Sequence, residues 1–402
     1  MGSWRPRRLL LWRFGGRTER KGNNMRRLLA VLFVLALVVG AMGPVGAEPP
    51  AQEPVTVLGP WFDSPDEEDA DLADAFVAEL ERVAGKRFEI IYEYADEIEL
   101  VDRVEGPNPP DLIITPQPGL LADLAAELVD LSEFVNPKSL RRDFGDYLID
   151  LGTVDGAVLG GPVEASLKSL VWYKTAAFAA HGYAVPETFT ELVALSDAMV
   201  ADGESPWCNY IESGFATGWM GTDWVEDLLL GAEGPEVYDQ WVEHSVVFQD
   251  PRVEIAFERY QLMVETPGFV FDRPNMLSVP FWANVFPLAE EDCLMHKQAS
   301  YFTDFIRFGL GEEYLDEFAT FKFPSVDAEF AAAVVGGGSF VAALNQRTEV
   351  RQLVRFMLSD RFGQEALAEA GGFVLPNQRF DTRRYTDGLN RSIAEDIQAA
   401  LR

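Results

Sequence analysis

The sequence predicts an α/β protein made of two α/β lobes, whose chain segments interleave and are joined by a hinge. Three observations support this class. The 402 residues are too many for one ordinary core. Strand and helix patterns alternate in residues 55–119, and short strands return in residues 290–345 after a helical stretch. Interleaving of this kind requires the chain to cross between two sheets several times, and such crossings form a hinge.

The first third of the chain has a strand–helix–strand–helix–strand order. Residues 55–58 form a short apolar run, and apolar residues recur at helical spacing in residues 72–83, with Gly85 as the expected helix end. Residues 88–94 alternate as in a strand, and residues 111–115 have the composition of a buried strand. This order predicts a parallel sheet with right-handed crossovers.

Two loops of this sheet carry candidate ligand-binding residues. In parallel sheets the ligand crevice lies at the carboxyl ends of the strands, where these two loops fall. The first loop contains Trp61 and Asp63, an aromatic ring close to a carboxylate, and the second contains Gln117. Trp61 is about as well explained by packing as by binding, since loop tryptophans commonly fill the edge of a core.

A second α/β set begins after a Gly-Gly-Pro break at residues 160–162. Residues 167–173 have the pattern of an apolar strand, and Thr188 with Glu191 forms a capping box that opens a helix. Further strands are expected at residues 294–302, 318–323 and 334–335, and a helix at 347–358. The sequence therefore supplies two sheets whose strands come from separated stretches of the chain.

The charge of the chain is strongly acidic and unevenly distributed. The formal net charge is −32, from 33 basic and 65 acidic residues. Residues 1–47 hold nine basic residues and one acidic residue, so the remainder has 24 basic against 64 acidic groups, close to −40. Such a surface repels nucleic acid, anionic lipid and phosphorylated or polycarboxylate ligands. A neutral or cationic ligand fits such a surface better than an anionic one. The alternative is that the acidic residues form a solvated surface that keeps the protein soluble and say nothing about the ligand.

The N-terminus has the pattern of an export signal. Residues 25–27 are Met-Arg-Arg, residues 28–42 are an unbroken apolar run, and residues 45–47 are small, as a cleavage site requires. Residues 1–47 are therefore predicted to be an N-terminal extension and signal peptide, and residues 48–54 a proline-rich linker. The protein is expected to be exported, with the uncleaved apolar run as a possible membrane anchor.

The two cysteines are expected to form a disulfide. An exported chain with only Cys208 and Cys293 is explained more simply by a disulfide than by two free thiols. Closing a loop of that length would stabilise the fold by about 4 kcal/mol in the chain-entropy model. A metal site is not expected, because two distant cysteines and the scattered His181, His244 and His296 do not make a ligand set.

Several segments in order resemble the extracellular solute-binding proteins of carbohydrate ABC importers, the group that includes maltose-binding proteins. The resemblance rests on residues 154–164, 171–174, 181–192, 337–340 and 368–376. Residues 171–173, 211–214, 216–219, 222–227 and 293–300 look like the branch that binds α-glucosides. The usual Tyr-Asn pair is replaced here by Tyr173-Lys174, and the usual Trp by Phe189. The order of the segments carries the resemblance, because none of them is specific alone.

The resemblance implies a periplasmic-binding-protein-like fold of type II, with two lobes closing on a sugar between them. It places lobe 1 at residues 55–160 plus 337–372 and lobe 2 at residues 161–336 plus 373–402. It also implies a monomer that hands its sugar to the permease subunits of an ABC importer in the membrane. No cofactor is expected.

Further candidate ligand-binding residues follow from the expected crossings and the loops around them. Trp219 and Asp223 stand in a Gly-rich loop that lets backbone approach a ligand, with Thr222 as the expected helix cap. The remaining candidates lie at strand ends or expected crossings, namely Glu164, Phe302, Asp304, Gly337 and Phe373. Carboxylates suit such a site, because hydrogen bonds to an ionised acceptor are the stronger ones.

Other functions remain open at this point. Catalysis is not expected, because nucleophile motifs such as G-x-S-x-G and metal spacings such as H-E-x-x-H are missing from the sequence. Among binding functions, the ligand could be another small polar or cationic solute. A ligand-binding ectodomain of a membrane sensor is a further alternative.

Overall fold

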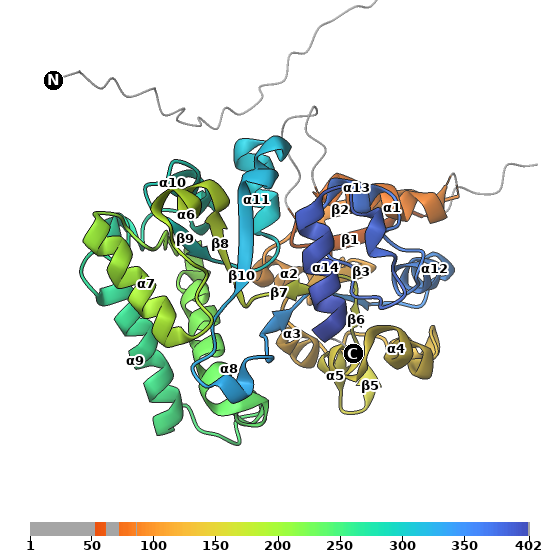
Figure 1. Ribbon diagram of the computed structural model, residues 1–402. Helices are drawn as coiled ribbons and strands as arrows, with labels where there is room; N and C mark the ends of the chain where they lie inside the picture. Colours follow the sequence, from red (N-terminus) through yellow and green to blue (C-terminus); the bar gives the residue numbers. More distant parts are fainter. Residues whose placement is uncertain (1–52, 62–71, 86, 401–402) are drawn as a thin grey trace, which may run out of the picture. The chain divides into compact units, whose positions relative to one another are not determined.

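The computed structural model describes residues 53–61, 72–85 and 87–400. It has the predicted class, an α/β fold, with two main sheets and two further two-stranded pairs in the described residues (Figure 1). The predicted signal peptide, Asp63 and most of the predicted linker lie outside the described residues. Within the described ranges, helices of the length and apolarity needed to cross a membrane are missing.

The larger sheet has five strands in the order β2-β1-β3-β12-β6. Its strands are β1 (Val55–Gly59), β2 (Ile90–Tyr94), β3 (Leu112–Thr115), β12 (Phe340–Ala343) and β6 (Gly161–Pro162). β1 pairs with β2 and β3 in parallel, as predicted, whereas β12 is antiparallel to both β3 and β6. The sheet thus joins the first third of the chain to a strand more than 200 residues further along.

Helices from both ends of the sequence cover this sheet. α1 (Leu72–Ala84) buries Phe76 and Leu80 completely, which is the apolar face that its spacing predicted. α12 (Thr348–Met357) and α13 (Ala366–Ala370) pack against α1, and all three lie together with β1 and β2 in Figure 1. The other elements of this part are α2 (Glu97–Val104), α3 (Gly119–Asp123), α4 (Pro137–Phe144), α5 (Asp146–Leu151), β4 (Thr153–Val154) and β5 (Ala157–Val158).

The smaller sheet has three antiparallel strands in the order β10-β8-β9. They are β10 (Phe318–Lys322), β8 (Leu170–Lys174) and β9 (Met295–Lys297). The strand expected at residues 167–173 is divided, because Leu170 N–H bonds back to the Lys168 carbonyl and interrupts it. The strand expected at 294–302 ends at Lys297, and α11 (Phe302–Leu310) begins where the strand was expected to finish.

Long helices pack on this second sheet. α7 (Phe189–Asp202) opens with the predicted capping box of Thr188 and Glu191. α8 (Trp219–Val242) packs on α9 (Pro251–Glu265), and its helical backbone is interrupted at Gly234, which has φ 83°. The remaining helices are α6 (Thr175–His181), α10 (Val285–Ala289) and α14 (Gly388–Ala400).

Three chain segments run side by side between the two sheets. β7 (Ser166–Leu167) pairs with β11 (Gly336–Gly337), and Ala165 forms a bridge with Val374 through a 2.8 Å hydrogen bond from its N–H. These are the crossings that a hinge requires. β6 begins at Gly161, one residue after the expected end of the first part of lobe 1 at residue 160, and yet it pairs in the larger sheet. The exact division into lobes stays a prediction.

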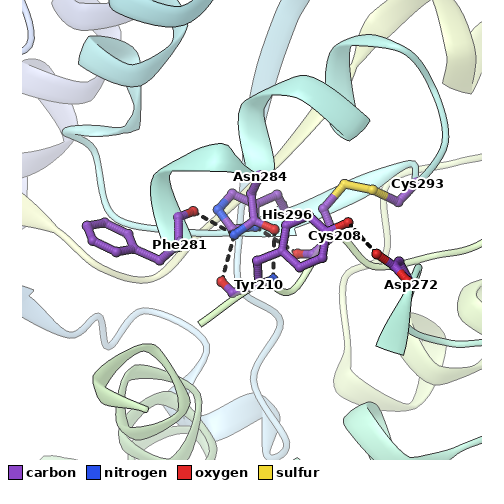
Figure 2. Close-up of a disulfide and its surroundings, with 7 residues drawn as sticks. All are labelled: Cys208, Tyr210, Asp272, Phe281, Asn284, Cys293 and His296. Atoms are coloured by element: carbon purple, nitrogen blue, oxygen red, sulfur yellow. Dashed lines mark hydrogen bonds between the residues drawn. A yellow bond between two sulfur atoms is a disulfide. The ribbon is translucent and has the colours of Figure 1, made fainter. Parts of the chain in front are cut away.

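The predicted disulfide is present. Cys208 and Cys293 are bonded across 85 residues of sequence with a Cα–Cα distance of 5.4 Å, and both are fully buried (Figure 2). The Nδ1 atom of His296 lies 2.9 Å from the Cys208 carbonyl oxygen. Asn284 secures the neighbouring backbone, accepting from Tyr210 N–H and donating to the Tyr210 carbonyl, both at 2.8 Å. The disulfide therefore lies in an ordered, hydrogen-bonded part of the core.

Candidate functional site

Glu164 lies between two crossing segments. Ser339 Oγ donates to Glu164 Oε2 at 2.6 Å, and the two residues also exchange backbone hydrogen bonds of 3.2 and 3.3 Å. A Cβ on Gly338 would lie 2.1 Å from the Glu164 carbonyl oxygen, so the close approach depends on glycine there. Glu164 is 7% exposed, and burial raises the pKa of its carboxyl to about 7, against the lowering effect of Ser339.

Asp304, in the first turn of α11, lies against the last crossing segment. A Cβ on Gly372 would fall 1.5 Å from Asp304 Oδ1, so only glycine allows the carboxyl this position. Burial raises the pKa of Asp304 to about 7, with Arg307 opposing the rise and Glu164 and Asp387 adding to it. Arg307 approaches Asp304 Oδ1 only at 3.8 Å, because its closer partner is Asp387 at 2.8 Å. The charge of the Asp304 carboxyl is therefore only partly balanced by a cation, and 29% of the side-chain surface is accessible.

Asp223 is a buried partner of Lys168. The Lys168 ammonium lies 2.8 Å from Asp223 Oδ1 and 3.8 Å from Glu226, and Asp223 is 4% exposed. Gly337, on the paired strand, leaves room for this lysine, since a Cβ there would lie 3.2 Å from Lys168 Cε. The predicted residues Asp223 and Gly337 thus both lie next to Lys168.

Thr222 is not the helix cap that the sequence predicted. The helix begins three residues earlier, at Trp219, after Gly218 with φ 104°, and the N-terminus has no side-chain cap. Thr222 instead lies in the first turn, where its hydroxyl donates to the Trp219 carbonyl at 2.6 Å. The glycine supplies the left-handed turn into the helix, which a capping threonine would not adopt.

Trp219 starts a row of aromatic rings. Its ring meets Phe281 edge-on at 5.1 Å, Phe281 meets Phe305 at 5.6 Å, and Phe305 meets Tyr301 at 6.1 Å. The four rings of the row are all partly exposed. The Tyr301 hydroxyl donates to Gln298 Oε1 at 3.0 Å.

Tyr301 connects this row to the carboxyl groups. Burial raises the pKa of its hydroxyl well above the ordinary value, and the charges of Asp223 and Glu164 add to the rise. Ser300, the residue before Tyr301, accepts a 3.1 Å hydrogen bond from Leu167 N–H, so the end of the aromatic row lies beside the crossing strand β7. Phe281 and Phe305 were not among the residues singled out from the sequence, and no local pattern distinguishes them from core aromatics.

Trp61 and Phe373 form a second aromatic group. Their rings are 5.3 Å apart, and Trp61 also meets Phe76 at 5.0 Å and stacks on Tyr92 at 6.4 Å. The backbone N–H of Trp61 donates to the Tyr92 hydroxyl at 3.0 Å. Trp61 is partly exposed, whereas Phe373 is completely buried. Because Phe373 follows Gly372, this group adjoins Asp304.

Phe302 and Gln117 lie in different surroundings from the other candidates. Phe302 is completely buried between Trp172 at 5.1 Å and His296 at 4.7 Å, so it packs in the core. Gln117 is exposed after β3, and its N–H bonds locally to Thr115 Oγ1. Within the part of the chain that the structure describes, no group of three or more His, Cys, Asp or Glu residues is arranged to hold a metal ion.

Comparisons with known proteins show which family the chain resembles. Residues 65–268 match the family model described as bacterial extracellular solute-binding protein. The chain is 33% identical over 381 residues to the osmoprotective compounds-binding protein GgtB of Synechocystis, covering 93% of this chain and 88% of that relative. It is 32% identical over 316 residues to the alpha-glucosides-binding periplasmic protein AglE of Rhizobium meliloti, covering 75% and 68%.

Solved structures share the fold. A chitin oligosaccharide binding protein superposes with a TM-score of 0.68 at 18% identity, covering 86% of this chain and 87% of that one. This agreement extends over nearly the whole described chain and supports the type II class with its two lobes.

Proposed function

Because the chain belongs to the bacterial extracellular solute-binding proteins, we propose that it captures a short neutral carbohydrate, an α-glucoside or small oligosaccharide, and delivers it to an ABC importer. Members of this family are binding proteins, and the chain is accordingly not an enzyme. The observation that carries the proposal is the row of rings from Trp219 to Tyr301, which begins one turn before Asp223 on α8 and ends beside Ser300, whose Oγ accepts from Leu167 N–H of the crossing strand β7 at 3.1 Å.

This arrangement has the chemistry that a sugar requires. A pyranose presents an apolar face that stacks on an aromatic ring and a rim of hydroxyls that need directed hydrogen bonds. Trp219 supplies an accessible ring, while Glu164 and Asp304 are carboxyls that can accept, or when protonated donate, a hydrogen bond. The site would be formed by Trp61, Asp63, Gln117, Glu164, Trp219, Asp223, Phe302, Asp304, Gly337 and Phe373, with Phe302 and Phe373 acting through packing.

Charge supports a neutral ligand. The nearby cations already have carboxylate partners, Lys168 with Asp223 and Arg307 with Asp387, both at 2.8 Å. An anionic ligand would therefore meet uncompensated carboxyls in a protein of net charge −32. The names of the two relatives, for osmoprotective compounds and for alpha-glucosides, are compatible with a small glycoside as the common ligand class.

Closure about the crossings would provide the signal for transport. The three adjacent segments at Ala165, Gly337 and Val374 are short and lie close to glycines, which is common at hinges. A ligand that contacts both lobes selects the closed state, and the permease would recognise that state. In this proposal lobe 1 comprises residues 55–160 plus 337–372, and the protein acts as an exported monomer.

A ligand screen tests the proposal. The purified protein is heated with maltose, trehalose, sucrose and methyl α-glucoside, and positive sugars are titrated by calorimetry. We expect at least one α-glucoside to raise the melting temperature and to remain chemically unchanged, because a ligand that binds only the folded state stabilises it. Stabilisation by glucuronate but by no neutral sugar would contradict the proposal.

A second candidate ligand is a small cationic solute. Among the residues that the structure describes, Glu164 has no ion pair and Asp304 has only Arg307 at 3.8 Å, and a bound ammonium would provide a closer cation. Choline belongs in the same screen for this reason, and its binding in place of sugars would favour this alternative. Genes for two permeases beside the receptor gene would separate an importer receptor from a sensor ectodomain.

A further inference from the structure

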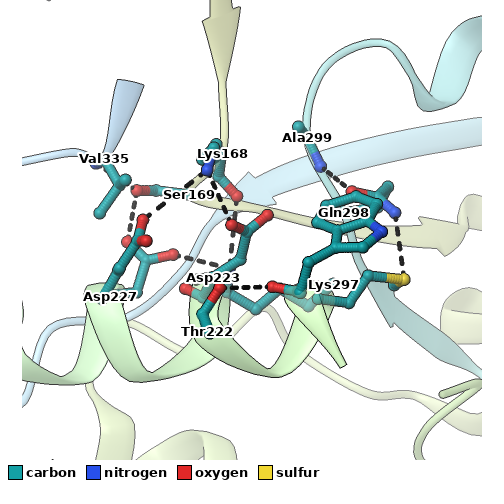
Figure 3. A network of polar contacts seen from close by, with 12 residues as sticks. Lys168, Ser169, Thr222, Asp223, Asp227, Lys297, Gln298, Ala299 and Val335 are labelled. Carbon is teal, nitrogen blue, oxygen red and sulfur yellow. Dashed lines mark hydrogen bonds and ion pairs between the residues drawn. The ribbon is translucent and has the colours of Figure 1, made fainter. Parts of the chain in front are cut away.

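A network of polar contacts joins the start of α8 to the hinge (Figure 3). Lys168 and Ser169 directly follow the crossing strand β7, and both reach into the first turns of α8. Lys168 binds Asp223, and the Ser169 hydroxyl donates a short hydrogen bond to Asp227. Two consecutive residues of one crossing therefore hold two successive turns of the same helix.

The same serine also holds a second crossing. The Val335 N–H donates to Ser169 Oγ at 2.7 Å, and the Lys168 N–H donates to the Val335 carbonyl at 2.9 Å. Val335 directly precedes β11. The Ser169 hydroxyl thus uses both its acceptor and its donor capacity to connect Val335 with Asp227, and its side chain is completely buried.

A buried ion pair completes the network. Lys297 Nζ lies 2.8 Å from Asp227 Oδ2 and donates to the Asp223 carbonyl at 3.0 Å, with side-chain exposures of 1% and 5% for Lys297 and Asp227. Buried pairs of this kind give little net stability, because desolvation offsets most of their attraction. Their directional contacts nevertheless define a single position for the helix relative to the strands.

The start of α8 depends on these contacts for its position. Its N-terminus lacks a side-chain cap, and Trp219 is its first residue, one turn before Asp223. We propose that Ser169 is a positioning residue for ligand binding, which holds α8 against two hinge crossings and thereby sets where the Trp219 ring stands relative to the crossings. This inference rests on the proposed function for the identity of the ligand, but the position of Trp219 can be measured without any ligand.

The variant Ser169→Ala tests the proposal, with Ser196→Ala as a matched control. Ser196 is also a completely buried serine whose hydroxyl makes two bonds, donating to the Leu192 carbonyl at 2.9 Å and accepting from Trp207 Nε1 at 3.2 Å. It contacts neither crossing in these bonds. Both variants lose a buried hydroxyl with two partners, so a purely structural role predicts similar consequences for the two.

Affinity for the sugar identified by the screen is measured by calorimetry well below the melting temperature. We expect Ser169→Ala to weaken binding roughly three- to thirtyfold, the range seen when a coupling network is interrupted. Ser196→Ala is expected to stay within about twofold. Equal affinities for the wild type and Ser169→Ala, or equal losses in both variants, would overturn the proposal.

A ligand-free measurement covers the case in which no sugar binds. With 5-fluorotryptophan incorporated, the ¹⁹F resonance of Trp219 is assigned by Trp219→Phe, and Ser169→Ala should shift or broaden it while Ser196→Ala leaves it in place. Lys168→Met removes a second link to α8 from a side chain that is 27% exposed, and it should act in the same direction if Ser169→Ala fails to fold. An unmoved Trp219 resonance in both link variants would refute the positioning role whatever the ligand is.

Discussion

Replacement of Glu164 by Gln should change how the stability of the protein depends on pH. In the folded state burial raises the pKa of Glu164 to about 7, above the ordinary value of 4.5. Between pH 4.5 and about pH 7, Glu164 therefore keeps a proton in the folded protein that it has released in the unfolded chain. The stability that this proton gives is fully present below the unfolded pKa and is lost as pH rises through about 7.

The size of the effect follows from the two pKa values. One pKa unit corresponds to about 1.4 kcal/mol, so the contribution of Glu164 is about 3 kcal/mol, most of it lost between about pH 5 and pH 8. Glutamine keeps the shape and the hydrogen bond from Ser339 but cannot titrate. The free energy of unfolding of the wild type should therefore fall relative to that of Glu164→Gln over this pH range.

Urea unfolding, followed by circular dichroism at several pH values, measures this difference. Asp304, whose pKa is raised in the same direction, titrates in both proteins and cancels to first order in the comparison. Glu89→Gln provides the control, because Glu89 is an exposed glutamate directly before β2. Parallel stability curves for the wild type and Glu164→Gln would show that the carboxyl is ionised at neutral pH in the folded state.

Three further predictions concern the ligand, the disulfide and the buried histidine. Trp219→Ala should weaken sugar binding about tenfold if stacking is real, whereas the exposed Trp282→Ala should not, and equal calorimetric affinities would remove Trp219 from the site. The double variant Cys208→Ala with Cys293→Ala should lower the free energy of unfolding by about 4 kcal/mol, as 85 residues of loop are released, and a loss below about 1 kcal/mol would contradict this. Burial lowers the pKa of His296 to about 4, below its ordinary 6.5, so the stability that the neutral imidazole gives is lost as pH falls through about 4. In urea titrations the free energy of unfolding of His296→Gln should therefore fall less steeply with acid than that of the wild type. An equal fall in both proteins would argue against a neutral imidazole in the fold.

The regular elements were predictable where local patterns decide them. The period of α1 and the capping box at Thr188 have local signatures, and both are present. The strand β2 is present as well, but it begins at Ile90, and its side chains do not alternate between buried and exposed. The strand expected at 294–302 was wrong in its second half, because Gln298 and Ser300 use their side chains to bind backbone N–H groups of Ala299 and Leu167. Those bonds depend on tertiary neighbours, which a single sequence does not reveal.

Only some residues of the candidate site could be predicted from the sequence. Carboxylates and tryptophans at loop positions can be recognised, but their partners come from far along the chain. Phe281 lies 62 positions after Trp219, and Ser339 lies 175 positions after Glu164. The cap predicted at Thr222 failed for the same reason, because the first turn of α8 is held by distant residues and not by a neighbouring side chain.

The helical backbone of α8 is interrupted at Gly234, and the two halves on either side still line one pocket, through Glu226 from the first half and Trp241 from the second. The first half is bound to the hinge, while the second, from Pro235 to Val242, leads into a surface turn where Val247 and Phe248 are about 60% exposed. This turn lies outside the contacts that hold the start of α8 at the hinge, so a dye attached at Val247 is expected to leave ligand recognition intact. The turn is therefore a suitable point for labelling the protein or for attaching it to a surface.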